Sequence, residues 1–227
     1  MQNRSIYDTL LELPLFKGVS RVKISEIVGL AKFHFLKFEP GTQFVQAGAP
    51  CTHLVFVLAG KVRMTTRLQN SAITVGQTLT GPSIVSPDFL FGMKTTYPFS
   101  VTAIDTASVV QLSKSDYLKI LNADQVCLLN SLNYLSMNAQ KPYAILSIDN
   151  DNAVSRFAFF VMSLTLASST EIEISCSVNE RRHLFGATEA QTDEVLHRLK
   201  TANILEYDQE TIKIKSRRAL LETLESE

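Results

Sequence analysis

The side chains best suited by type and spacing to recognise another molecule lie in the C-terminal part of the chain. They are amide, hydroxyl and basic groups with one acidic residue among them: Arg181, Arg182, Thr188, Glu189, Gln191, Thr192, Arg198 and Lys213. A glutamine amide can bond to the edge of an adenine in the major groove, and Arg and Lys bind phosphate. We therefore take these residues as candidate contacts to double-stranded DNA. An ordinary solvated surface is the alternative for the basic ones.

The residues around these candidates predict two helices joined by a tight turn. Ser177 precedes a short helix over residues 179–185, and Gly186 supplies the turn. Thr188 and Gln191 have the spacing of a capping box, in which the side chain at each position bonds to the backbone of the other. The capping role alone would account for Gln191.

A strand, a turn and a second strand are predicted after the second helix. Asn203 suits the left-handed conformation that often ends a helix. Residues 204–207 and 211–215 alternate as strands on either side of Asp208-Gln209-Glu210. Helix, glycine turn, helix and hairpin is the order of a winged helix-turn-helix, whose second helix enters the major groove.

The net charge of the C-terminal region argues against binding to DNA. Residues 171–227 hold eight Lys/Arg against twelve Asp/Glu, a net charge of −4, whereas residues 1–150 hold thirteen against nine, a net charge of +4. Segments that bind nucleic acid normally carry a positive excess. Two interpretations therefore stay open: a DNA-binding regulator, and a sensor or interaction protein of the same fold whose helix-turn-helix is degenerate.

The N-terminal part is predicted to form a small β-barrel preceded by helices. Apolar residues recur at helical spacing in residues 6–13 and again after Ser20. From Phe33 to about Leu112 short strands alternate with Gly and Pro turns, a pattern typical of a barrel or sandwich. We therefore expect an α+β fold: an N-terminal antiparallel jelly-roll barrel, a long dimerisation helix and a C-terminal winged helix-turn-helix.

A long helix is predicted between the two parts. Its apolar residues repeat at intervals near 3.5, which favours pairing with a second chain: Val126, Leu129, Leu132 and Leu135. Packing of this stripe on the helix's own domain is the alternative. Pro142 is expected to end the helix. We therefore expect a sensor domain over residues 1–122, a dimerisation helix over 123–141 and a DNA-binding domain over 142–227.

Several classes of protein are disfavoured by composition and spacing. Cys51, Cys127 and Cys176 are odd in number and far apart, and the four histidines form no ligand cluster, so we expect neither disulfides nor a metal site. No nucleophile elbow or glycine-rich phosphate loop is present, and we expect no enzyme and no cofactor. No apolar run reaches the ~18–20 residues that span a bilayer. A cytoplasmic protein without a signal peptide or a membrane partner is the expectation.

The whole chain resembles the Crp/Fnr family of bacterial transcription regulators. The resemblance rests on Pro14-Leu15-Phe16-Lys17-Gly18-Val19-Ser20, on Val55-Phe56-Val57-Leu58-Ala59-Gly60-Lys61-Val62, and on His183 to Thr188 followed by Leu196 to Leu205. It implies a barrel of the cyclic-nucleotide-binding type, a dimerisation helix and a DNA-binding domain. It also implies that an effector in the barrel controls DNA binding by a homodimer.

The chain departs from that family at three places. Nucleotide-binding members carry a Gly-Glu pair followed by an Arg, but Ser83 to Gly92 and Tyr97 to Ala103 contain no such pair, so we do not expect cyclic AMP to bind. An unknown effector could use an apolar pocket of aromatic residues, although core packing is the favoured role for Phe89, Phe91, Tyr97 and Phe99.

The other two departures concern iron and the second helix of the motif. The chain lacks the closely spaced cysteines that hold an iron–sulfur cluster in oxygen-sensing members. Haem ligation by His34 or His53 stays open as an alternative, although an isolated histidine is usually structural or solvated. Glu189 and Glu194 stand where family members commonly carry Arg, which removes guanine contacts and adds repulsion from phosphate.

Overall fold

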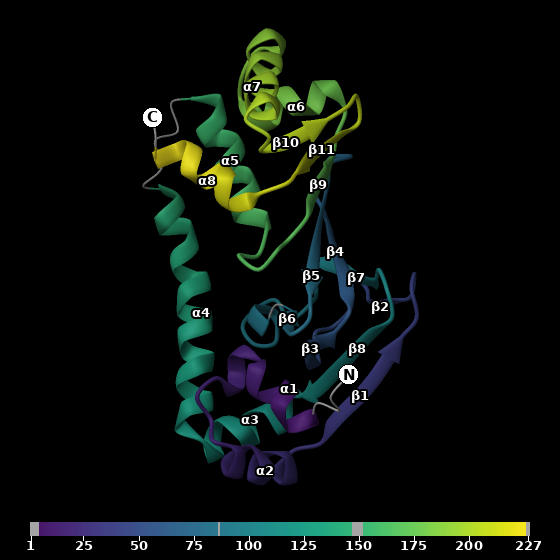
Figure 1. The fold of residues 1–227 in the computed structure, drawn as a ribbon, viewed down its shortest axis with the longest axis vertical. Helices are drawn as coiled ribbons and strands as arrows, with labels where there is room; N and C mark the ends of the chain where they lie inside the picture. Colours follow the sequence, from purple (N-terminus) through teal and green to yellow (C-terminus); the bar gives the residue numbers. More distant parts are fainter. Residues whose placement is uncertain (1–4, 86, 147–151, 226–227) are drawn as a thin grey trace. The chain divides into compact units, whose positions relative to one another are not determined.

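The computed structural model describes residues 5–85, 87–146 and 152–225 (Figure 1). The chain divides into two compact units. The barrel unit comprises Met1–Val62 and Thr80–Ala139, and the C-terminal unit comprises Arg63–Leu79 and Gln140–Glu227. Residues 63–79 therefore belong to the C-terminal unit, although in the sequence they lie between the two segments of the barrel unit. Ser86 and residues 147–151, which include part of the expected domain boundary, lie outside the described residues.

Serine side chains cap three helices of the barrel unit. Ser5, Ser20 and Ser113 each accept a backbone N–H at the start of a helix, the arrangement that satisfies the first free amides. The helices are α1 (Ile6–Glu12), η1 (Pro14–Phe16), α2 (Arg21–Leu30), η2 (Pro87–Phe89), α3 (Lys114–Ala123) and α4 (Gln125–Leu146).

The strands of the barrel unit form an antiparallel roll. One sheet has the order β1-β8-β3-β6, and β2 pairs with β7. The central strand β3 is buried on both faces, which explains its continuous apolar run, and Phe56 and Phe16 lie fully inside the core. The strands are β1 (Phe33–Phe38), β2 (Gln43–Val45), β3 (His53–Ala59), β6 (Ser83–Val85), β7 (Phe99–Ala103) and β8 (Ala107–Ser113).

The C-terminal unit packs helices on a sheet of order β10-β11-β9-β5-β4. The stacked rings of Phe157 and Phe185, 4.4 Å apart, lie in its core with Leu196 and Ile212. Its elements are β4 (Lys61–Arg67, beginning in the barrel unit), β5 (Thr74–Thr80), α5 (Ala153–Leu164), β9 (Ile172–Ser175), α6 (Val178–Phe185), α7 (Glu189–Thr201), β10 (Leu205–Tyr207), β11 (Thr211–Ile214) and α8 (Arg217–Glu225).

The structure corrects the expected end of the long helix. Helix α4 continues through Pro142 to Leu146, so the prediction that Pro142 ends it is wrong. A proline removes one backbone hydrogen bond and crowds the preceding turn, but the flanking turns can still carry the helix onward. Two short strands, β6 and β9, were not predicted, and β5 extends beyond the residues 73–75 expected for it.

Candidate nucleic-acid interface

Two capping boxes fix the ends of α6 and α7. The Ser177 side chain accepts the Glu180 N–H while the Glu180 carboxylate accepts the Ser177 N–H, and Thr188 and Gln191 do the same for α7. The capping box predicted at Thr188 and Gln191 is confirmed. The Gln191 Oε1 accepts from the Thr188 N–H at 3.0 Å. The amide oxygen of Gln191 is thus bound within the protein, and only its amide nitrogen is left to approach a ligand.

The turn between the helices depends on a glycine and on an arginine from α5. Gly186 has φ +56°, the left-handed conformation that glycine adopts without strain. Arg156 Nε donates to the Phe185 carbonyl oxygen at 3.0 Å, and its Cδ and Nε would lie 3.0 Å from a Cβ on Gly186. A side chain at position 186 would therefore push against Arg156 as well as strain the backbone.

Helix α7 presents one apolar face to the core and one polar face outward. Leu196 and Leu199 are buried, and Thr192 is buried with its hydroxyl donating to the Thr188 carbonyl at 2.8 Å. Thr192 therefore cannot reach a base from this position, contrary to its candidate role. The exposed residues of the helix include three of the candidates together with further charged groups: Glu189, Gln191, Asp193, Glu194, His197, Arg198 and Lys200.

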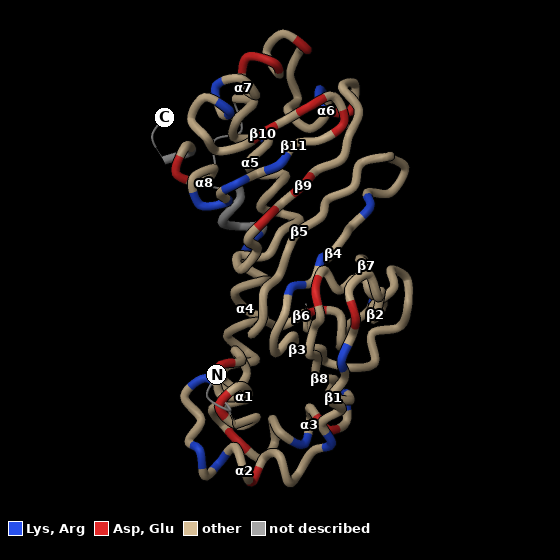
Figure 2. The backbone as a smooth tube through the Cα atoms, turned by 45° about the vertical axis from the view of Figure 1, so that its right-hand side comes forward, with Lys and Arg blue, Asp and Glu red and all other residues tan. Residues whose placement is uncertain are grey.

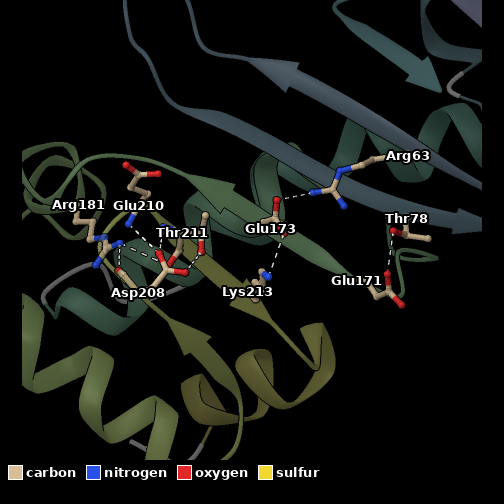
Figure 3. A network of polar contacts seen from close by, with 9 residues as sticks. All are labelled: Arg63, Thr78, Glu171, Glu173, Arg181, Asp208, Glu210, Thr211 and Lys213. Carbon is tan, nitrogen blue, oxygen red and sulfur yellow. Dashed lines mark hydrogen bonds and ion pairs between the residues drawn. The ribbon is translucent and has the colours of Figure 1, made fainter. Parts of the chain in front are cut away.

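Arg181 has a structural role in place of the predicted contact with DNA. It is 5% exposed, and its Nη2 donates to the carbonyl oxygens of Asp208 and Thr211 in the β10–β11 turn (Figure 3). Among the described residues its Nε has no acceptor. The guanidinium ties α6 to the hairpin, so we remove Arg181 from the candidate DNA contacts.

The turn that Arg181 holds is itself closed by Asp208. The Asp208 carboxylate accepts the N–H groups of Glu210 and Thr211 at 2.9 and 2.8 Å, and the Thr211 hydroxyl at 2.8 Å (Figure 3). These hydrogen bonds, led by that from the Glu210 backbone, lower the pKa of Asp208. The turn of the β10–β11 hairpin is therefore closed by a carboxylate that stays charged at neutral pH.

An open groove lies beside the turn between α6 and α7. Its volume is about 610 Å³, and its lining contains the candidates Arg182, Thr188 and Gln191 with neighbours that include His183 and Asn179. Arg182 is exposed, in contrast to Arg181. A guanidinium near the N-terminal end of α7 suits a phosphate group, because both the cation and the helix terminus attract negative charge.

The basic residues in and around the β10–β11 hairpin are interleaved with acidic ones (Figure 2). Lys213 Nζ lies 3.8 Å from Glu173 Oε2, and Lys215 Nζ lies 2.8 Å from Glu206 Oε1. Both lysines remain exposed. Such surface pairs are weak and a phosphate can replace the carboxylate, so Lys213 remains a candidate whose charge is partly offset.

Helix α4 turns polar residues toward the barrel and its leucines outward. Asn130 Nδ2 donates to the carbonyl oxygens of Leu15 and Lys17, and the hydroxyl of buried Ser131 accepts from Tyr117 at 2.8 Å. The four predicted interface residues are all exposed: Val126 38%, Leu129 57%, Leu132 50% and Leu135 38%. More than a third of each side chain is therefore exposed in the single chain, which favours an interface over packing on the helix's own domain.

The four aromatic candidates for an effector pocket do not form one group. Tyr97 and Phe99 are buried with ring centroids 5.7 Å apart, and Phe89 lies 6.1 Å from Phe99. Phe91 instead contacts the ring of Tyr117 and the ammonium group of Lys114. These contacts favour core packing for Tyr97 and Phe99, as the sequence indicated.

Two residues important for the site were missed by reasoning from the sequence. Arg156 gave no local signal, because its partner Phe185 lies 29 positions away. Glu180 did give a signal: Ser177-Val178-Asn179-Glu180 has the Ser-x-x-Glu spacing of a capping box. Its contacts with Ser71 and Ala72, more than 100 positions away, could not have been read from that spacing.

Residues 35–124 match the family model of the cyclic nucleotide-binding domain. Among solved structures the chain is similar to the catabolite activator protein of Thermus thermophilus, with 18% identity, a TM-score of 0.50, and coverage of 94% of this chain and 99% of that one. It is also similar to CprK complexed with OCPA (17% identity, TM-score 0.48, coverage 87% and 92%) and to the sensor domain of the transcriptional regulator DNR from Pseudomonas aeruginosa (17%, 0.46, 58% and 91%). No curated protein matches the chain.

The comparisons confirm the barrel part of the expected fold. The match supports a jelly-roll-like sheet of the cyclic-nucleotide-binding type within a mixed α/β chain, and the overall fold is like that of the catabolite activator protein. At these identities the likeness concerns the fold.

The segment from residue 80 to residue 103 offers few charged groups to a ligand. Between residues 80 and 103 the charged side chains are Asp88 and Lys94. Asp88 accepts from Asn138 Nδ2 at 2.7 Å, and Lys94 is exposed on a loop. A buried phosphate would lack the cation that it needs there. The described residues include no cluster of three possible metal ligands, and no helix among them is long and apolar enough to cross a membrane.

Proposed function

We propose that the chain is a homodimeric, DNA-binding transcription regulator of the Crp/Fnr type, with no catalytic activity. The observation that carries the proposal is the succession α6, Gly186, α7, β10 and β11, which is the element order of a winged helix-turn-helix, with one polar face of α7 exposed. The proposed contacts to DNA are Arg182, Thr188, Gln191, Arg198 and Lys213, with Glu189 at the start of the helix modulating them.

The exposed leucines of α4 support the dimer. A helix whose polar residues bond to its own barrel and whose leucines face solvent is unusual in a monomer, because a contiguous apolar surface normally marks an interface. Two copies joined along this stripe would place one helix-turn-helix on each half of a two-fold symmetric site.

The proposed role of the barrel is to sense an effector that is not a cyclic nucleotide. The lack of a cation between residues 80 and 103 that could meet a buried phosphate supports this part of the proposal. Effector binding would shift the population of DNA-binding conformations without changing any covalent bond.

Selection from genomic DNA tests the proposal. The purified full-length protein is mixed with genomic fragments over a range of salt concentrations, and the retained fragments are sequenced. Enrichment of a two-fold symmetric motif that persists at moderate salt is the expected result. Retention without any motif, vanishing at moderate salt, would indicate non-specific charge contact and contradict the proposal.

A second candidate function is supported by the acidic residues of α7. Glu189, Asp193 and Glu194 are exposed and would repel phosphate. A protein that kept this fold for interaction with other proteins would show no motif in the selection. Such a protein would gain DNA affinity when Glu189 and Glu194 were both changed to Arg.

A further inference from the structure

Three side chains that carry donor atoms for a metal ion lie on one face of the sheet formed by β1, β8 and β3. His34 on β1 is directly opposite Gln111 on β8, and His53 on β3 is directly opposite Ser113, two residues further along β8. Opposite residues of an antiparallel pair share a face, and so do residues two apart on one strand. His34, Gln111 and His53 therefore project from three neighbouring strands on the same side of the sheet.

The two imidazole rings approach each other over β8. Their centroids are 6.4 Å apart and their planes are nearly perpendicular. Strands two places apart in a sheet are separated by about 9–10 Å, so both side chains lean over the strand between them. His34 is exposed, whereas His53 and Gln111 are half-buried. The pair of rings is therefore accessible from solvent.

Hydrogen bonds fix the position of His53. Its Nδ1 lies 2.8 Å from the Thr52 hydroxyl oxygen, and its carbonyl oxygen accepts from the Tyr97 hydroxyl at 3.1 Å. When Nδ1–H donates to Thr52, the lone pair of the neutral ring is on Nε2 and is available to a metal. Histidines that bind metals are commonly oriented by a hydrogen bond from the other ring nitrogen. Thr52 therefore suits the tautomer of His53 that a metal site needs.

The distance between the rings suits one shared ion. A bond of about 2.0–2.1 Å from metal to nitrogen places two coordinating imidazole rings with their centroids roughly 5–6.5 Å apart, depending on the angle at the metal. The observed 6.4 Å lies at the wide end of this range. Rotation of the exposed His34 ring directs its nitrogen toward the ion. Gln111 lies between the two histidines in the sheet, where its amide oxygen can supply a third ligand.

The donor atoms select a class of metal. Imidazole nitrogen suits Zn²⁺, Ni²⁺ and Cu²⁺, whereas Mg²⁺ and Ca²⁺ prefer oxygen ligands. The described residues include no group of three His, Cys, Asp or Glu side chains that could hold a metal, and here the third ligand is an amide oxygen. Water completes the coordination of a metal that has three protein ligands. The spacing of these residues in the sequence does not indicate a metal site, because they meet only through the pairing of strands.

We propose that His34, Gln111 and His53 bind one divalent transition-metal ion, with Zn²⁺ as the reference case. The ion would join β1, which is at the end of its sheet, to β3 across the strand between them. A ligand that binds only the folded state stabilises that state, so the bound ion holds the edge strand in place and raises the unfolding temperature. The inference concerns the barrel unit alone and does not depend on the proposed binding to DNA.

Isothermal titration calorimetry with ZnCl₂ tests the site in the full-length protein, prepared without a histidine tag. The variants are His34→Gln, His53→Gln and Gln111→Glu, with His197→Gln as the matched control. His197 is an exposed histidine on α7 in the other unit. Thermal unfolding without metal establishes that each variant is folded. Electron paramagnetic resonance of the Cu²⁺-loaded protein reports the nitrogen atoms bound to the metal.

The native protein is expected to bind one Zn²⁺ per chain and to unfold at a higher temperature when it does. His34→Gln and His53→Gln should each weaken binding by at least the roughly 10- to 100-fold that follows loss of a hydrogen-bond partner of a metal ligand. Gln111→Glu should tighten binding, because a charged oxygen replaces a neutral one. His197→Gln should leave binding unchanged, and Cu²⁺ should show two imidazole nitrogens in the native protein and one in either histidine variant.

Two kinds of result would overturn the inference. The first is a native protein that binds no Zn²⁺. The second is binding that arises elsewhere, shown by affinity that survives His34→Gln and His53→Gln or that falls equally in His197→Gln. An affinity unchanged by Gln111→Glu would overturn the three-ligand site, because a carboxylate at that position would then not reach the ion.

Discussion

Gly76 lies directly under the guanidinium of Arg63, so that a Cβ built on the glycine would be 2.6 Å from Nη2. The two residues are on neighbouring strands of one hairpin, and the glycine leaves the space through which Arg63 reaches Glu173, 110 positions away in the sequence. The atoms in the way belong to the flexible end of a side chain, so a substitution at Gly76 would displace Arg63 without forcing the backbone apart.

This relationship predicts that substitutions at the two positions are coupled. Gly76→Ala should change the free energy of unfolding little in the native background. The half-exposed ion pair with Glu173 contributes about 0.2–1 kcal/mol, and Ala in a strand regains about 0.5–1 kcal/mol over Gly. In an Arg63→Ala background the same substitution should stabilise by about 0.5–1 kcal/mol, because no guanidinium remains to be displaced. Urea unfolding of the four proteins measures the coupling.

Gly29→Ala is the control for that cycle. Gly29 lies in α2, and a Cβ there would meet no atom within 4 Å. Its effect should be the same in both Arg63 backgrounds. Additive effects of Gly76→Ala and Arg63→Ala would contradict the proposed contact.

Arg181 and Arg182 are neighbours for which opposite outcomes are expected. Arg181→Met leaves the carbonyls of Asp208 and Thr211 without their buried donor and should destabilise the protein by about 1–3 kcal/mol. Arg182→Gln should leave stability unchanged, weaken DNA binding and lower the slope of log K against log salt by roughly 0.9, the value for one phosphate contact. Thermal unfolding and binding titrations at several salt concentrations separate the two effects. An unchanged salt slope for Arg182→Gln would remove it from the proposed interface.

The exposed stripe of α4 predicts a dimer that one charge can disrupt. Leu129 is the most exposed of the four interface residues. Leu129→Glu would bury a charge between two copies, so light scattering should report a monomer where the native protein is a dimer. Val22→Glu is the matched control, since Val22 is 74% exposed on α2. A native monomer, or a dimer that survives Leu129→Glu, would exclude this stripe as the interface.

Glu180 predicts how the C-terminal unit responds to acid. Hydrogen bonds from the Ser177 backbone and side chain, with further ones from Ser71 and Ala72, lower the pKa of Glu180 below its ordinary value of 4.5. A carboxyl whose pKa is lower in the folded state stabilises that state above pH 4.5, and the stabilisation is lost as the pH falls through the folded-state value. Glu180→Gln should therefore flatten the dependence of stability on pH below 4.5, measured by thermal unfolding from pH 3 to pH 7.

The matched variant for Glu180 is Glu206→Gln. The pKa of Glu206 is lowered chiefly by a hydrogen bond from Lys215, which follows β11, and residues 63–79 make no contribution. Glu206→Gln should also flatten the dependence of stability on pH below 4.5. It should leave amide hydrogen exchange in residues 71–79 unchanged. Loss of hairpin protection in both variants would show that Glu180 has no special role there.

The acidic face of α7 predicts a gain of binding on charge reversal. Glu189→Arg with Glu194→Arg replaces two negative charges by two positive ones on an exposed face. Affinity for any DNA should rise and the salt slope should steepen by up to about 1.8, two phosphates at roughly 0.9 each. Affinity for the native motif relative to random DNA should fall, because the added contacts do not read bases. Titration with both DNAs measures the change.

Local features of this protein followed from its sequence alone. The caps at Ser20, Ser113 and Thr188, the left-handed Asn203 and the order of helices and hairpin all depend on bonds between residues a few positions apart. Such bonds require particular residue types at fixed spacing, and this spacing is visible in the sequence. The strands of the barrel were visible for a similar reason, since an alternation of apolar and polar residues reflects one buried face and a continuous apolar run, as in β3, reflects two.

Only the tertiary structure decided which side chains are buried and which residues far apart in the sequence contact each other. Arg181 and Arg182 are neighbours of the same residue type. Arg181 is buried against the β10–β11 hairpin, whereas Arg182 lines an open groove. The pairing of β5 with β9 joins residues about 100 positions apart, and the polar face of α4 is turned inward by carbonyl groups of the η1 region. Neighbours in sequence set the backbone hydrogen bonds of a helix or turn, whereas burial and charge pairing depend on which distant surfaces meet, and that is a property of the packed chain.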